Sequence, residues 1–186
     1  MKKEIIIIAG PNGSGKSTLA SKLNFSCDFI NADYCEKKFF NRVKDKNERE
    51  KLAIFQVGKA ISESIKQNIS FAFETVFSTV QIPSFLSKAK KQGYQITLHF
   101  IATENPDINI SRVAKRVSEG GHDVPKEKIV ERYGKSIAIL PALLEFVDTA
   151  TLYDNSHKNL IPFLVKENGE IKLIDVLPKW IDGLDV

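Results

Sequence analysis

The sequence predicts an α/β fold built on a five-stranded parallel sheet with helices on both faces. Short apolar runs of strand length alternate along the chain with stretches in which apolar residues recur every three or four positions. Such alternation is typical of a parallel sheet whose strands are connected by helices. The pattern changes near the C-terminus, where two strand-like runs flank Glu167-Asn168-Gly169, a hairpin signal. This end of the chain is therefore expected to extend the sheet with antiparallel strands.

The predicted elements follow one another without a linker, so residues 1–186 are interpreted as one domain. Strands are expected at 4–9, 28–31, 70–76, 94–102 and 149–154, and the hairpin lies within 160–176. Helices are expected to begin at 19, 47, 82, 109 and 125, and the last of these reaches about residue 140. In the helix at 47–67, the spacing places four isoleucine and valine residues on one face: Ile54, Val57, Ile61 and Ile65.

The composition is that of an ordinary globular protein, with 42% hydrophobic and 27% charged residues. No apolar run approaches the length of a membrane span. Cys27 and Cys35 have no CxxC spacing, and reduced thiols are the default of a cytoplasmic protein. The net charge of +4 favours an anionic substrate but does not by itself indicate nucleic acid.

One motif carries most of the functional information. Residues 10–18 read Gly10-Pro11-Asn12-Gly13-Ser14-Gly15-Lys16-Ser17-Thr18, which matches G-x-x-x-x-G-K-[ST] between a strand and a helix. The glycines let backbone N–H groups converge on phosphate oxygens, and the helix N-terminus adds partial positive charge. Lys16 is expected to reach the β- and γ-phosphates, and the Ser17 hydroxyl to ligate Mg²⁺. The fold is therefore expected to be that of a P-loop NTPase binding ATP and Mg²⁺.

Two acidic residues should lie at the same edge of the sheet as this loop, because ligands gather beyond the carboxyl ends of parallel strands. Asp33 follows the second strand, and Glu74-Thr75 ends the third. Asp33 suits the base that accepts a proton from an alcohol, although it would equally suit a helix cap. Glu74 would bind Mg²⁺ through a water molecule, bind substrate hydroxyls, or form a structural hydrogen bond. Thr75 adds a hydroxyl to the substrate cleft.

A basic segment at about 109–136 is typical of a lid of the kinase type. Arg112 and Arg116 share a helical face, Gly120-Gly121 provides a flexible break, and Arg132 follows on the next helix. Closing such a lid would bring guanidinium groups over the transferring phosphoryl group. The alternative is a solvated charged face, which we accept for the neighbouring lysines. Asn155 follows the fifth strand, which is a natural place to contact the adenine. A plain turn explains this residue equally well.

Several motifs in this order resemble the zeta toxin family in its short form, over roughly residues 4 to 156. They are the phosphate loop, Asn31-Ala32-Asp33, Phe73-Glu74-Thr75, 112–117 (RVAKRV), 120–125 (GGHDVP), 129–133 (IVERY) and 153–156 (YDNS). The family's best-known members use ATP or GTP to phosphorylate a sugar hydroxyl of UDP-N-acetylglucosamine, and a small antitoxin holds them inactive.

The resemblance assigns roles to individual residues. It implies an ATP-dependent kinase with Asp33 as base, Glu74 at the substrate, and Lys16 and Ser17 on phosphate and Mg²⁺. Arg116 and Arg132 would stabilise the transferring phosphoryl group. Apart from the resemblance, Arg112 is expected at the nucleotide, where it would stack on adenine.

Other functions remain open at this point. A kinase of another small alcohol, nucleoside or antibiotic would use similar parts. A guanine-nucleotide switch would need N-K-x-D, which the sequence lacks, and an assembly ATPase would need a strand ending in Asp-Glu. A polynucleotide kinase would need a basic track with exposed aromatic residues, whereas the basic residues cluster near the lid. A small-molecule kinase is therefore the preferred interpretation.

Overall fold

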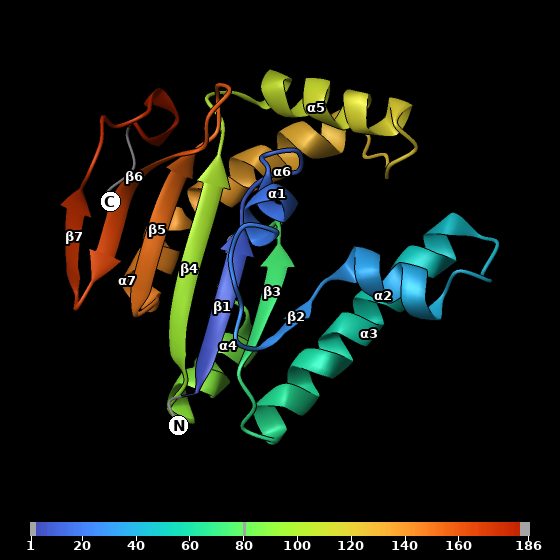
Figure 1. Cartoon of the computed structure of the whole chain (residues 1–186), viewed down its shortest axis with the longest axis horizontal. Helices are drawn as coiled ribbons and strands as arrows, with labels where there is room; N and C mark the ends of the chain where they lie inside the picture. The colour runs from blue at the N-terminus through green and yellow to red at the C-terminus, as the bar shows by residue number, and fades with distance from the viewer. Residues whose placement is uncertain (1–2, 80, 183–186) are drawn as a thin grey trace.

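The computed structural model describes residues 3–79 and 81–182, and its centre is a seven-stranded sheet (Figure 1). The strand order is β2-β3-β1-β4-β5-β6-β7. The strands are β1 (Glu4–Ala9), β2 (Asp28–Ile30), β3 (Phe71–Thr75), β4 (Gln95–Ala102), β5 (Thr149–Asp154), β6 (Ile161–Glu167) and β7 (Glu170–Leu173). The first five pair in parallel and the last two are antiparallel, which confirms the predicted sheet and its extension.

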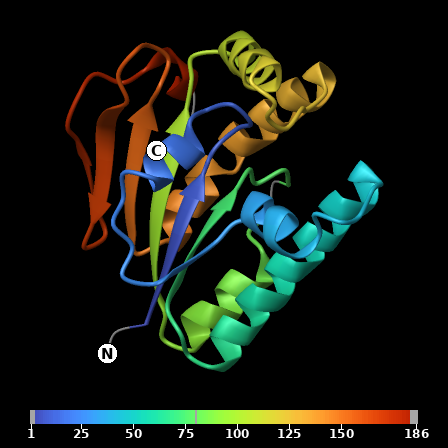
Figure 2. The same ribbon diagram turned by 45° about the vertical axis from the view of Figure 1, so that its right-hand side comes forward.

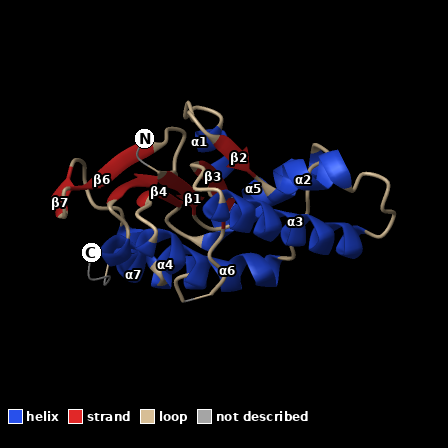
Figure 3. Ribbon diagram, turned by 90° about the horizontal axis from the view of Figure 1, so that it is seen from below, coloured by secondary structure: helices blue, strands red, loops and turns tan. Residues whose placement is uncertain are grey.

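The helices cover the sheet unequally. They are α1 (Lys16–Ala20), α2 (Ala32–Phe39), α3 (Lys46–Lys66), α4 (Ser84–Lys91), α5 (Pro106–Ser118), α6 (Lys126–Ala138) and α7 (Leu140–Phe146). Figure 3 shows α4, α6 and α7 on one face and α1 on the other. The larger hydrophobic core lies beneath the first group, where Ile5, Phe71 and Leu98 are fully buried. None of the helices in the described part of the chain is long and apolar enough to cross a bilayer.

Two helical pairs project from the same side of the sheet (Figure 2). One pair is α2 and α3, and the other is α5 and α6, the predicted lid. The α3 helix begins and ends close to its predicted bounds, but Ile54 is 66% exposed. The adjacent Ala53 is buried instead, so the assignment of Ile54 to the buried face is wrong.

The helix predicted to run from 125 to about 140 ends earlier, at Ala138. A separate helix, α7, begins at Leu140 with Pro141 in its first turn. Pro141 has no N–H with which to continue the hydrogen bonds of the preceding helix.

The chain then returns through β6 and β7 to a short 3₁₀ turn, η1 (Lys179–Ile181). Trp180 packs against Phe100 and Phe163 and fixes this end to the core.

Candidate active site

The phosphate loop joins β1 to α1 in a conformation that depends on glycine. Gly10 and Gly15 have φ angles of 143° and 105°, which side-chain-bearing residues rarely adopt. A Cβ at Gly10 would lie 2.0 Å from the Ile101 carbonyl oxygen, and one at Gly15 would lie 2.4 Å from the Asn155 amide nitrogen. Glycine at these two positions therefore lets the loop take this conformation and pack closely against the end of β4 and the segment that follows β5.

Lys16 is the first residue of α1, three positions earlier than the sequence pattern indicated. Its side chain is only 6% exposed, and the ammonium donates a hydrogen bond to the Pro11 carbonyl over 2.9 Å. Burial lowers the pKa of Lys16 to about 8, and the positive charges of Arg116 and Arg132 act in the same direction. Glu74 and Asp33 oppose this shift. An anionic ligand would relieve the cost of keeping this buried ammonium charged.

Two asparagine side chains brace the phosphate loop. Asn109, fully buried in α5, donates to the Asn12 carbonyl over 2.6 Å and accepts from Thr103. Asn155 donates to the Ser14 carbonyl over 2.7 Å. The sequence prediction placed Asn155 at the adenine, whereas its amide here supports the loop. Asn109 was missed altogether, because a buried asparagine in a helix leaves no distinctive spacing.

Glu74 is central to the polar network beside Lys16. Its Oε2 accepts hydrogen bonds from the Ser17 hydroxyl at 3.0 Å and the Asn31 amide at 3.2 Å. Its Oε1 lies 3.9 Å from the Lys16 ammonium. These contacts place Glu74 against the expected Mg²⁺ ligand.

The donor set here fits Mg²⁺, which prefers hydroxyl, carboxylate and phosphate oxygens and retains several waters. Among the residues described, no three His, Cys, Asp or Glu side chains form a metal-binding cluster. The ion would therefore be held by the Ser17 hydroxyl and the nucleotide phosphates, with Glu74 reached through water.

Asp33 lies in the first turn of α2 and is exposed. The alternative role, in which Asp33 caps the helix, is wrong, because the N-cap is Asn31, whose Oδ1 accepts from the Tyr34 amide at 3.2 Å. Asn31 thus fixes the start of α2 and also holds Glu74. The Thr75 hydroxyl accepts from the Phe77 N–H within the strand-end turn.

Three arginines of the lid approach the loop, and two of them carry donors without partners. Arg132 donates to the Asn12 side chain at 3.3 Å, and Arg112 donates to the His157 carbonyl at 3.4 Å. Arg112 Nη1 and Arg116 Nε and Nη2 are buried and have no hydrogen-bond partner among the described residues. Buried donors without partners are costly, and phosphate oxygens would satisfy them.

The loop between α5 and α6 extends across to the α2–α3 pair. His122 Nε2 lies 3.6 Å from the Glu50 carboxylate in α3. Gly121 lies against Arg116, where a Cβ would approach the arginine side chain to 2.5 Å. The two projecting helical pairs therefore meet, and Asp33 belongs to one while the arginines belong to the other.

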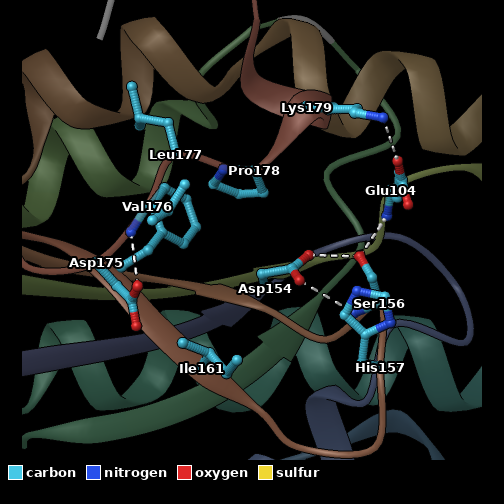
Figure 4. Close-up of a pocket in the computed structure, with 11 residues that line it drawn as sticks. Glu104, Asp154, Ser156, His157, Ile161, Asp175, Val176, Leu177, Pro178 and Lys179 are labelled. Atoms are coloured by element: carbon cyan, nitrogen blue, oxygen red, sulfur yellow. Dashed lines mark hydrogen bonds and ion pairs between the residues drawn. The ribbon is translucent and has the colours of Figure 1, made fainter.

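A separate cavity of about 450 Å³ lies beyond β5, beneath the C-terminal segment (Figure 4). Asp154 accepts hydrogen bonds there from Ser156 and from the Trp180 indole, at 2.6 and 2.9 Å. None of the loop residues 10–18 lines this cavity. These hydrogen bonds hold the segment after β5, whose Asn155 contacts the phosphate loop. We therefore assign Asp154 a structural role.

Comparisons with known proteins identify the family. The family model described as zeta toxin matches residues 1–161. An uncharacterized protein of Haemophilus influenzae is 33% identical over 137 residues, which span 72% of this chain and 94% of that one.

Solved structures share the fold. The PezAT toxin–antitoxin system of Streptococcus pneumoniae includes a chain with a TM-score of 0.65 and 19% identity, covering 86% of this chain and 71% of that one. A chain of the AvrRxo1-ORF1:-ORF2 complex with ATP has a TM-score of 0.73 and 12% identity, over 94% of this chain and 61% of that one. A chain of the Pnkp1/Rnl/Hen1 RNA repair complex has a TM-score of 0.57 and 17% identity, over 90% of this chain and 50% of that one.

The kinase-type fold and the family match bear out the prediction of an ATP-dependent kinase. The chain belongs to the zeta toxin family.

Proposed function

We propose that this kinase transfers the γ-phosphate of ATP to a hydroxyl of a UDP-amino sugar, with UDP-N-acetylglucosamine as the leading acceptor. One observation carries the phosphotransfer assignment. Glu74 accepts a hydrogen bond from Ser17 and lies 3.9 Å from the buried Lys16 ammonium, and Arg132 of a separate helix donates to Asn12 of the same loop. These contacts from separate elements support a role of the loop in phosphate transfer.

On the donor side, Lys16 and the first turn of α1 bind the β- and γ-phosphates. A bound Mg²⁺ would neutralise phosphate charge beside Ser17. Arg116 and Arg132 supply charge where the transferring group becomes most negative, and the unpartnered donors of Arg116 suit that role. Arg112 contacts the segment after β5, where its free Nη1 would meet the nucleotide.

On the acceptor side, Asp33 orients the attacking hydroxyl and accepts its proton as the oxygen–phosphorus bond forms. The bond from the γ-phosphorus to the bridging oxygen breaks, and ADP leaves with that electron pair. Glu74 lies between the Ser17 hydroxyl and the acceptor side, so it positions both. Thr75 would add a hydroxyl to the acceptor cleft.

Side chains of α2 support an acceptor with an aromatic base and negative charge. Tyr34 follows Asp33 and is 57% exposed, and the Lys38 ammonium lies 5.3 Å from its ring centroid. An aromatic face next to an ammonium suits a uracil ring and a diphosphate.

A cytoplasmic location and an antitoxin partner fit this proposal. The acceptor and ATP are both cytoplasmic metabolites, and Cys27 and Cys35 are free thiols. The similar PezAT structure is described as a toxin–antitoxin system. Coexpression with genes adjacent to that of this protein, followed by copurification, tests for such a partner.

A polynucleotide 5′-hydroxyl is a second candidate acceptor. The exposed Tyr34 and Phe39 lie among basic side chains of α2, and that is the aromatic and basic combination a strand of nucleic acid would require. The kinase fold of the Pnkp1 complex is compatible with either acceptor.

The test is a phosphotransfer screen with γ-labelled ATP and Mg²⁺, using UDP-sugars, free sugars, nucleosides and a 5′-hydroxyl oligonucleotide. The proposal predicts label on UDP-N-acetylglucosamine, which mass spectrometry would locate on a sugar hydroxyl. Transfer to the oligonucleotide alone would replace this acceptor with the second candidate. Absence of transfer to every acceptor, with ATP binding intact, would contradict the proposed function.

A further inference from the structure

The edge of the sheet far from the active site carries an unusual exposed surface. All four residues of β7 are exposed, and β7 ends the strand order on the side opposite β2. Figure 1 shows β7 at one edge and the α2–α3 pair at the other. Five large apolar residues in or just after this strand are between 44% and 82% exposed: Ile171, Leu173, Ile174, Val176 and Leu177.

This edge also lies outside the family-matched residues, which end at 161. Catalysis common to the family therefore does not account for it. A free edge strand presents unpaired N–H and C=O groups, and exposed apolar clusters on proteins commonly mark interaction sites. Native sheets usually protect such edges with charged residues, proline or a covering element. An edge with five exposed apolar side chains in or just after its strand is therefore a candidate binding surface.

The backbone of β7 has its free groups at alternate residues. The Ile174 N–H donates to the Phe163 carbonyl across the β6–β7 pair. Alternation along an antiparallel ladder then directs the N–H groups of residues 172 and 170 toward β6. The N–H and C=O groups of Ile171 and Leu173 therefore point away from the sheet.

The side chains of β7 are complementary to themselves. Glu170 and Lys172 alternate with Ile171 and Leu173, and they already form an exposed ion pair of 3.7 Å within one chain. If two copies of β7 pair antiparallel about Ile171, each Glu170 faces the Lys172 of the other copy. One face of the joined sheet then carries two Glu170–Lys172 pairs of opposite charge, and the other face carries a continuous apolar strip.

We propose that two copies of this chain associate through antiparallel pairing of their β7 strands, with Ile171 on the twofold axis. The Leu173 side chain lies on the same face of β7 as Ile171 and adds to the apolar strip at the interface. The two active sites lie at the outer ends of the joined sheet and remain open. This inference does not depend on the acceptor proposed above.

The first test is sedimentation velocity of the full chain across micromolar concentrations. The proposal predicts a species of twice the 20.9 kDa monomer mass. Ile171→Lys places two ammonium groups at the centre of the interface and should yield the monomer. The matched control is Phe55→Lys, which removes a 73% exposed apolar side chain from α3 and should leave the dimer intact. A monomeric wild-type chain would overturn the proposal.

A charge exchange tests the register. Glu170→Lys and Lys172→Glu each place like charges across the two copies and should raise the dimer dissociation constant about tenfold. The double variant restores opposite pairs and should recover most of the affinity. Failure of the double variant to recover affinity, with circular dichroism unchanged, would refute the pairing about Ile171.

Discussion

The donor and acceptor sides of the active site are built differently. On the donor side Lys16 is buried, and Asn109 and Asn155 fix the phosphate loop. Two buried donors of Arg116 have no partner within the part of the chain that the structure describes. On the acceptor side Asp33, Tyr34 and Phe39 are exposed on the short helix α2. If the function proposed above holds, this contrast implies a phosphate site formed before any ligand arrives and an acceptor site completed by its substrate.

The largest effect is expected from Lys16→Met. It removes the ammonium that meets the phosphates but keeps an apolar stem of similar length in the buried position. Transfer should fall below detection in a coupled ADP assay while thermal unfolding stays cooperative. Lys22→Met, at an exposed position, serves as the control. Normal turnover in Lys16→Met would remove the basis for a phosphate site at this loop.

The next largest effect is expected from Arg116→Ala and, separately, from Arg132→Ala. An arginine that stabilises the transferring phosphoryl group contributes about 10³–10⁵ in rate, and little of that is realised in the ground state. Steady-state kinetics should show kcat falling much more than ATP affinity. Lys128→Ala, on the exposed side of α6, should behave as the wild type. Near-normal kcat in both arginine variants would make the lid an ordinary charged surface.

Asp33→Asn should reduce transfer by about 10²–10⁴, the usual contribution of a general base. The amide keeps the size of the side chain but cannot accept the proton. Glu63→Gln, an exposed carboxylate at the far end of α3, is the matched control. Rapid-quench measurement of single turnovers isolates the chemical step, and an unchanged rate there would leave Asp33 without a catalytic role.

A smaller effect should follow from pH. Because burial lowers the pKa of Lys16 to about 8, the free protein loses this ammonium as the pH rises past that value. ATP binding should therefore weaken between about pH 7 and pH 9, with kcat at saturating ATP less affected because bound phosphate favours the charged form. The contribution of Lys16 to the free energy of unfolding should rise between pH 8 and 10.5, because in this range the unfolded chain keeps the proton that the folded protein has lost. A constant kcat/KM for ATP across this range would contradict the assignment.

The smallest effect is expected at Tyr34. Loss of a stacking ring is worth about 1–3 kcal/mol, so Tyr34→Ala should raise the acceptor KM by about tenfold or more and leave kcat nearly unchanged. Phe39→Ala, about as exposed and farther along α2, separates the two candidate acceptors. A sugar nucleotide would be affected by Tyr34 alone, whereas a polynucleotide would be affected by both. No change in either variant would exclude base stacking on α2.

The same contrast explains what the sequence could predict. β1 and β5 were predicted with their observed bounds, because long apolar runs and strand-length spacing are strong local signals. The phosphate loop is also predicted by its sequence, because its glycines adopt backbone angles that other residues rarely adopt. The helix α2 was anticipated only through the alternative that Asp33 caps a helix, and its extent was not predicted. Its eight residues have a single buried side chain, Cys35, and carry almost no apolar periodicity.

Other misses have similar physical causes. Asn109 and Asn31 act through side-chain hydrogen bonds to residues far away in the sequence, and a polar residue in a helix or turn does not reveal such partners. Ile54 satisfies a helical spacing yet is 66% exposed, whereas the adjacent Ala53 is buried. The expected placement of Asp33 and Glu74 near the loop followed from the strand ends, whereas their individual contacts depend on tertiary structure that the sequence pattern does not give.

Calorimetric titration of Mg²⁺–ATP into Asp33→Asn and Lys16→Met tests most directly whether the donor side is complete without the acceptor side. The account predicts that Asp33→Asn binds ATP with the affinity of the wild type, although it transfers phosphate poorly, and that Lys16→Met shows no measurable binding. An equal loss of ATP affinity in both variants would contradict the account, because it would make Asp33 part of the nucleotide site.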